Sequence, residues 1–593
     1  MSQNVYFNGE LLSIPGAYSA IDTSFIATRD SATGAKNIAI LGECAGGEPG
    51  VVQFFTEPHA AKSVLKSGEL LKACEKAWNP VSGTKQGVSL GGAYNIACIR
   101  TNTATKSTYS VLKNQGDTKP QLKFESTDWG QNTSHQIKIV DGTLNSTKKV
   151  IIYDQTVGTY ETFDNIGNLF SISYTGDQPY AEINVFLDGN NSMYLQTKIG
   201  ADEANAAEDI KIKLDPNILR SMKSLILELK AYDNYVVSAT NTYNTKLSVT
   251  DLDFIEKGDI KLSSGDPFRV TAIYKDLQSK LSSGSRLVNL VEFDKSKGAI
   301  DNINNYATLT GGTEGASPAS WLNYFDKLSN FDIDYIVPLT SDVAIHAELL
   351  SHVNKWSKSL GRERRGIVGG AIGETVDETL ARARDLQSSR MQIVHGGFYD
   401  YNTDNELELY PPYILAAAHA GRAAFLDDGE SATRDKYKMT LPEYKLGRTD
   451  IQNLKEGGCL AFEYVLASQG IGQSYVRLAQ DITTDTINSN ISLYRERATG
   501  ALADAINKEI RSTLDEMLTG KRTSAAELTS AQIAVISVLE DRLNRGHILA
   551  YKDVYLTKDG DTTRVDYSVA AAEVNNFTLI TGHYYSESIT LEG

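Results

Sequence analysis

A glycine-rich stretch in this sequence has a composition that could form a phosphate-binding loop. The stretch from Gly366 to Gly373 reads GIVGGAIG and lies between a predicted strand and a predicted helix, where backbone N–H groups often bind phosphate. A dinucleotide-binding motif ending at Gly373 requires glycine where Val368 stands. A Walker A motif is also absent, because Asp515 stands where its first glycine would be. We therefore interpret the stretch as a tight strand-to-helix turn and predict no cofactor.

The histidines, serines and cysteines form no known catalytic or metal-binding pattern. No histidine belongs to an H-E-x-x-H sequence, and His346 and His352 are expected on opposed faces of one helix. No serine lies in a G-x-S-x-G sequence. The four cysteines are too widely spaced for a C-x-x-C pair, and each is expected to be a small buried side chain: Cys44, Cys74, Cys98 and Cys459. We predict no catalytic residue, no metal site and no enzyme activity.

Charge and hydropathy exclude two further classes of partner. The chain of 593 residues carries 74 acidic and 58 basic side chains, a net charge of −16, which argues against nucleic acid. No run of 18 apolar residues occurs, and the first residues lack the pattern of a signal peptide, so we expect no membrane insertion. A basic cluster at Arg362, Arg364 and Arg365 is interpreted as a solvated loop or as ion pairs between subunits.

A split α/β core would have to position these residues. Apolar runs at 37–41, 94–99, 333–339, 367–368 and 391–394 alternate with helical patterns at 59–78, 317–325, 342–353 and 374–386. This alternation predicts a doubly wound parallel sheet. We therefore expect residues 29–105 and 302–433 to form one discontinuous domain.

Two other regions differ in texture from this core. Residues 106–301 repeat short strands and turns, which predicts a β-rich inserted outer domain. Residues 434–575 predict a mixed α+β domain, with long amphipathic helices at 492–518 and 524–545 followed by two strands. On the first helix, four side chains are expected to face the core: Leu502, Ile506, Ile510 and Leu514.

Both ends of the chain are predicted to be extended arms. In residues 1–28, short apolar runs flank Asn8-Gly9, a hairpin signal, and residues 576–593 alternate in part. Neither arm has an obvious partner nearby in sequence, so we expect both to add strands to other copies of the chain. The candidate interface residues are Val5, Phe7, Leu11, Tyr18, Phe577, Leu579 and Tyr584.

The order of several short elements resembles the tail sheath proteins of large contractile-tailed bacteriophages. The residues that carry this resemblance are Pro15-Gly16-Ala17-Tyr18, Gly46-Gly47-Glu48-Pro49, Lys66 to Leu71 through Ala77-Trp78, Thr310 to Gly315, Ala420-Gly421, and Leu543 to Ile548. The resemblance covers about two thirds of the chain, and the β-rich insertion matches least. A hairpin at Val5 to Leu12 departs from the family pattern.

The resemblance implies a structural subunit that needs no nucleotide. Such subunits stack as hexameric rings around a tail tube, exchange strands through their arms, and contract to drive the tube through the host envelope. It implies contacts with the tube, the baseplate and the tail terminator proteins, a place in the virion, and assembly in the host cytoplasm. The helix at 492–518 is expected near the tube, with four candidate contacts: Arg495, Arg497, Lys508 and Arg511.

Two alternative functions are compatible with the sequence. The chain could be another structural protein of a virion or surface array, which would share the β-rich composition and the arms. It could also be a nucleotide-dependent α/β enzyme, which would need a pocket near residues 369–373 with a bound cofactor.

Overall fold

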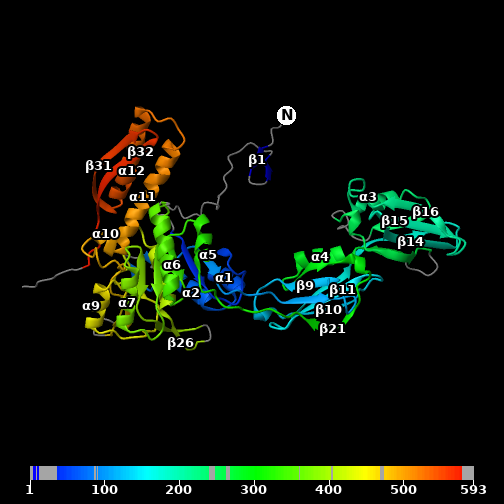
Figure 1. Ribbon diagram of the computed structural model, residues 1–593, viewed down its shortest axis with the longest axis horizontal. Helices are drawn as coiled ribbons and strands as arrows, with labels where there is room; N and C mark the ends of the chain where they lie inside the picture. The colour runs from blue at the N-terminus through cyan, green and yellow to red at the C-terminus, as the bar shows by residue number, and fades with distance from the viewer. Residues whose placement is uncertain are drawn as a thin grey trace, which may run out of the picture. The chain divides into compact units, whose positions relative to one another are not determined.

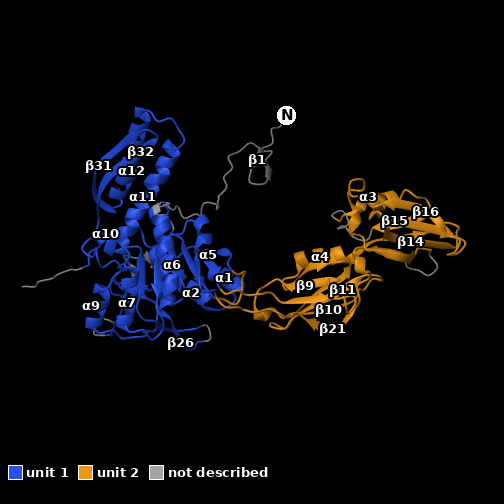
Figure 2. Ribbon diagram, viewed as in Figure 1, with its two compact units in different colours: residues 1–43, 50–101, 318–593 blue, residues 44–49, 102–317 orange. Residues whose placement is uncertain are grey.

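The chain divides into two compact units in the computed structural model. The structure describes residues 5–7, 10–12, 36–85, 88–89, 91–239, 247–261, 267–359, 361–402, 405–467 and 473–576. Unit 1 comprises residues 1–43, 50–101 and 318–593, and unit 2 comprises residues 44–49 and 102–317 (Figure 2). The insertion therefore begins and ends a little outside the expected residues 106–301.

A six-stranded sheet forms the centre of unit 1. Its strands follow the order β24 (Met391–Val394), β23 (Arg365–Gly369), β22 (Tyr335–Pro338), β3 (Ile38–Gly42), β7 (Ile96–Arg100) and β4 (Val52–Phe55). All neighbours are parallel except β4, which runs antiparallel to β7. Every residue of β3 is buried, as expected for a sheet covered on both faces.

Helices cover this sheet (Figure 1). The helices that contribute to its apolar core are α1 (Pro58–Leu65), α2 (Glu69–Trp78), α5 (Leu322–Lys327), α6 (Val343–Asn354), α7 (Val376–Leu386) and α8 (Pro412–Phe425). Ala39 and Leu41 belong to one apolar cluster with residues of α5, α6 and α7. Helix α8 lies along β22 and β23 and also crosses α2. The crossing is close at Gly421, where a Cβ atom would lie only 2.0 Å from the Ala77 carbonyl oxygen.

Residues beyond 434 extend this core before they start another. Helix α9 (Arg448–Glu456) and the segment after it place Leu454, Cys459 and Ala461 in the same apolar cluster as the sheet. Two small three-stranded sheets also belong to unit 1: one is formed by β25 (Phe398–Tyr401), β26 (Leu407–Tyr410) and β28 (Leu441–Pro442), the other by β27 (Lys436–Tyr437), β29 (Phe462–Val465) and β30 (Tyr475–Leu478). Two short strand pairs are β5 (Thr84–Lys85) with β6 (Val88–Ser89), and β1 (Val5–Phe7) with β2 (Glu10–Leu12).

The C-terminal part of unit 1 has an apolar core of its own. It contains α10 (Ser492–Arg495), α11 (Arg497–Leu518), α12 (Ala525–Asn544), β31 (Ile548–Asp559) and β32 (Thr562–Ala571). The single helix expected at 492–518 is broken at Glu496, whose extended backbone (φ −97°, ψ 129°) bridges to Ile482. Helix α12 begins as expected, because Ser524 and Glu527 form a capping box.

The described residues of unit 2 form two apolar cores, where the sequence suggested one β-rich domain. The first lobe holds β8 (Thr108–Val111), β9 (Leu122–Ser126), β10 (Gln136–Asp141), β11 (Lys148–Asp154), β12 (Thr159–Ile166), α4 (Ile273–Gly284), β20 (Val288–Phe293) and β21 (Ile303–Thr308). The second lobe holds β13 (Asn168–Tyr174), β14 (Tyr180–Leu187), β15 (Met193–Gly200), β16 (Ala207–Lys213), α3 (Met222–Leu229), β17 (Tyr235–Ala239), β18 (Ile255–Asp259) and β19 (Phe268–Thr271).

The second lobe is inserted into the first. The chain leaves the first lobe at Gly167 and returns at Ala272, where the Ala272 N–H donates to the Gly167 carbonyl oxygen at 3.1 Å. The two crossing points of the chain are therefore adjacent. Among the described residues of both units, no helix is long and apolar enough to cross a membrane.

Candidate functional site: the C-terminal helix pair and hairpin

The hairpin of β31 and β32 is the longest strand pair among the described residues of unit 1. Its two strands pair only with each other among the described residues, so each has an outer edge without a neighbour there. Leu549 and Tyr555 are exposed on β31. Unpaired strand edges present rows of N–H and C=O groups that can bind another strand.

Helices α11 and α12, which we call the helix pair, support this hairpin. Leu502, Ile506 and Ile510 of α11 pack with Val535 and Leu539 of α12 in one buried cluster. Residues of both strands of the hairpin complete the cluster, and Leu514 packs at its margin. The predicted apolar face of this helix is therefore confirmed. It faces the helix pair's own core and not the six-stranded sheet.

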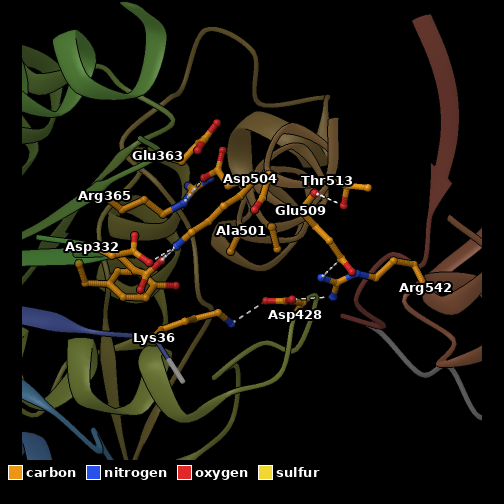
Figure 3. A pocket seen from close by; sticks show the side chains of 15 residues that line it. Lys36, Asp332, Glu363, Arg365, Asp428, Ala501, Asp504, Glu509, Thr513 and Arg542 are labelled. Atoms are coloured by element: carbon orange, nitrogen blue, oxygen red, sulfur yellow. Dashed lines mark hydrogen bonds and ion pairs between the residues drawn. The ribbon is translucent and has the colours of Figure 1, made fainter. Parts of the chain in front are cut away.

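Ion pairs join the helix pair to the α/β core along a polar seam (Figure 3). Asp504 of α11 accepts hydrogen bonds from Arg365 at 2.7 Å and from Arg390 at 2.8 Å. Three further pairs involve helix residues: Lys508 with Asp332, Arg511 with Glu363, and Arg542 with Asp428. The interpretation of the basic cluster is therefore wrong for two of its members, since Arg365 pairs within the subunit and Arg364 is buried against backbone carbonyls. Arg362 is an exposed loop residue, as expected.

Asp428 occupies a branch point of this seam. Its two oxygens contact Lys36 at 2.9 Å and Arg542 at 2.6 Å, and Arg542 also contacts Glu509 at 2.8 Å (Figure 3). These groups line a cavity of about 570 Å³. Burial by itself would raise the pKa of Asp428, but Lys36 and Arg542 hold it below its ordinary value. The carboxylate is therefore ionised at neutral pH.

A second carboxylate at the same cavity has the opposite shift. Burial raises the pKa of Asp334 to about 6, and the ammonium of Lys508, 3.9 Å away, limits the rise. Asp334 also accepts a hydrogen bond from the Asn37 N–H at 2.8 Å.

A fully buried ion pair fixes the first turn of α11. Arg497 is 1% exposed and binds Asp481, which is 0% exposed, at 2.8 Å. Arg497 also donates to the Tyr335 hydroxyl of β22, and His419 of α8 lies 3.3 Å from Asp481. Burial would raise the pKa of Asp481, but Arg497 and His419 hold it far below its ordinary value. The sequence gives no local sign of this pair, because its members are 16 residues apart in different elements.

All four predicted tube contacts bind acceptors within the subunit. Arg495 donates to the Lys455 carbonyl oxygen, and Lys508 and Arg511 pair with carboxylates while 46% and 45% of their side chains stay exposed. The prediction for Arg497 is wrong, because a side chain that is buried inside unit 1 cannot contact a tube. Its charge instead neutralises Asp481.

Only part of the predicted arm interface lies within the described residues. Strand β1 (Val5–Phe7) pairs antiparallel with β2 (Glu10–Leu12), so the hairpin predicted around Asn8-Gly9 is confirmed. Val5, Phe7 and Leu11 belong to these strands. The remaining candidates lie outside the described residues: Tyr18, Phe577, Leu579 and Tyr584.

The Gly-rich stretch forms a turn, as predicted. Strand β23 ends at Gly369, where a Cβ atom would lie 2.2 Å from the Tyr413 backbone nitrogen of α8. Helix α7 then begins with a capping box between Thr375 and Glu378, so its own side chains satisfy its first N–H groups. The glycine at 369 thus serves close packing. The four cysteines are all buried, as also predicted.

Comparison with known proteins identifies the family. No family model matches the chain. The tail sheath protein of Bacillus phage SP01 is 30% identical over 590 residues, covering 98% of this chain and 97% of that protein. The putative tail sheath protein of Enterococcus phage phiEF24C is 27% identical over 568 residues and 95% of each chain. A sheath tail protein from Listeria innocua shares the fold, with a TM-score of 0.51 and 14% identity over 92% of this chain and 94% of that one. The chain therefore belongs to the bacteriophage tail sheath proteins.

Proposed function

We propose that this chain polymerises as stacked hexameric rings around a tail tube and that the rings contract to drive the tube through the host envelope. Like its tail sheath relatives, the chain is a structural protein and not an enzyme. In this proposal it assembles in the host cytoplasm, becomes part of the virion, and meets the tail tube, baseplate and tail terminator proteins.

The observation that carries the proposal is the hairpin of β31 and β32. Its strands have 12 and 10 residues, and the helix pair packs against it. Two long edges without a neighbour among the described residues fit the addition of one strand on each side. The terminal arms supply such strands, since both are strand-like in sequence. Main-chain pairing would keep subunits linked while their other contacts change.

The tube contact stays a proposal for the three basic residues that are not buried. Arg495 of α10 is half-buried, and Lys508 and Arg511 of α11 are exposed, in a chain that is acidic overall. Reversing both Arg495 and Lys508 to Glu should weaken binding to purified tube protein, most strongly at low ionic strength, where charge contacts are least screened. Equal tube binding at all salt concentrations would exclude this segment as the contact.

Negative-stain imaging of the purified, concentrated chain tests the arm exchange. The full chain should form tubes, whereas chains lacking residues 1–23 or 577–593 should stay folded and unassembled. The second deletion starts after Asn576, because its side chain donates to Glu496 within unit 1. Phe7→Ser should also reduce tube formation. Normal tubes from both deletion variants would contradict the proposal that the arms exchange strands between subunits.

A further inference from the structure

The start of β3 is held by two carboxylates from different parts of unit 1. The Lys36 ammonium binds Asp428 at 2.9 Å and also donates to the Leu426 carbonyl oxygen. The next residue, Asn37, donates its backbone N–H to Asp334 at 2.8 Å. The predicted N-terminal arm, residues 1–28, precedes this point in the chain, and residues 29–35 connect the two. Residues 36 and 37 therefore fix the point at which that part of the chain joins the sheet.

Each of these carboxylates also holds a cation of the helix pair. Asp428 binds Arg542 of α12 at 2.6 Å, and Asp334 lies 3.9 Å from the ammonium of Lys508 on α11, which also pairs with Asp332. The structure thus contains two bridges, each formed by a residue at the start of β3, a core carboxylate and a helix-pair cation. The first bridge is Lys36–Asp428–Arg542, and the second is Asn37–Asp334–Lys508. One cavity is lined by both carboxylates, both helix-pair cations and Lys36. Figure 3 labels the members of the first bridge.

Burial makes the first bridge stronger than an ordinary surface pair. The side chains of Lys36, Asp428 and Arg542 are 12%, 10% and 10% exposed. Partly buried charges are screened less by salt than exposed ones. If Asp428 lost its charge, two cations at the cavity would lose a shared partner, so both ends of the bridge should loosen together.

We propose that Asp428 and Asp334 are positioning residues that couple the start of β3 to the helix pair, so that a pull on the N-terminal arm passes directly to the helices that carry the hairpin. This inference rests on the proposed function, in which the arm binds one neighbouring subunit and the hairpin receives strands from others. The coupling itself lies within one chain, so it can be measured without assembly.

The Asn37 amide is a direct reporter of the second bridge. In the full, unassembled chain, Lys508→Met should speed hydrogen exchange at the Asn37 amide roughly threefold or more, although residue 508 is distant in sequence. Arg511→Met is the matched control: it removes a cation from the same helix that pairs with Glu363 and should leave the Asn37 amide unchanged. Equal exchange at Asn37 in the wild-type and Lys508→Met chains would overturn the coupling.

A second pair of variants tests the first bridge. Asp428→Asn should speed exchange both in the peptide covering residues 36–42 and in α12. Asp504→Asn removes a carboxylate of the same seam that binds Arg365 and Arg390, and it should leave residues 36–42 unchanged. Equal effects of both variants on residues 36–42 would show general loosening and would overturn the proposal. The deletion experiment on tube formation tests the proposed function separately, since it reads assembly and not exchange.

Discussion

Helix α11 holds charge in two opposite settings. In its first turn, Arg497 and Asp481 form a pair without solvent, surrounded by groups of the α/β core. In its later turns, the side chains of Lys508 and Arg511 remain almost half exposed, and Lys508 pairs with the exposed Asp332. Breaking a buried pair leaves an uncompensated charge and costs several kcal/mol, whereas an exposed pair contributes about 1 kcal/mol or less. Helix α11 is thus held more firmly at its first turn than at Lys508 and Arg511.

The apolar residues support the same distinction. Leu502, Ile506 and Ile510 of α11 contribute to the helix pair's own core, which is separate from the cluster around the sheet. A polar seam can open with little exposure of apolar surface, so its opening avoids the main cost of unfolding. The fold therefore combines two apolar cores with a polar contact between them.

The largest expected effect tests the buried end of this comparison. Arg497→Met should lower the free energy of unfolding of unit 1 by about 3–5 kcal/mol, because Asp481 would remain charged and buried. The double variant Arg497→Met with Asp481→Asn should recover a large part of this loss. Urea unfolding followed by circular dichroism, with separate transitions for the two units, measures both. A loss below about 1 kcal/mol would contradict the distinction.

Acid offers a second, smaller test within the α/β core. Burial lowers the pKa of His346 to about 4, from 6.5, so the folded chain binds fewer protons than the unfolded chain between these values. Stability is then fully present above pH 6.5 and falls as the pH drops towards 4, by up to about 3 kcal/mol. His346→Gln should flatten this decline in urea unfolding between pH 7 and pH 4. Parallel curves for the two chains would contradict a neutral buried imidazole.

The smallest effect is expected at the exposed end of the seam. Lys508→Gln should cost about 0.5 kcal/mol at low salt, because Lys508 and its partner Asp332 are both exposed. The difference from wild type should vanish near 1 M salt, where exposed pairs are screened. The same urea measurement at two salt concentrations checks this. A salt-independent loss as large as that of Arg497→Met would remove the contrast between the two settings.

The sequence predicts the elements of this fold better than their contacts. The strands at 38–42 and 96–100 and the apolar face of α11 follow from local periodicity, and the structure contains them. The break at Glu496 could not be predicted, because its extended backbone pairs with the distant Ile482. Arg497 was expected on a surface since charged residues are usually exposed; only its tertiary partner Asp481 explains its burial.

The insertion shows the same limit. Its strands were predicted from alternation and turn residues, but alternation does not reveal how many cores the strands will build. The division into two lobes depends on which strands pair over long separations, such as β13 with β19 and β10 with β21. Those pairings are set by packing that the local pattern does not contain.

The adjacent crossing points at Gly167 and Ala272 make the second lobe of unit 2 an exchangeable cassette. Its first and last residues meet at one hydrogen bond of 3.1 Å, so the lobe occupies the position of a loop tip on the first lobe. Insertions at such tips add little closure entropy and disturb few contacts of the host. The fold of the first lobe therefore permits replacement of the second lobe by another folded module whose two ends lie as close together.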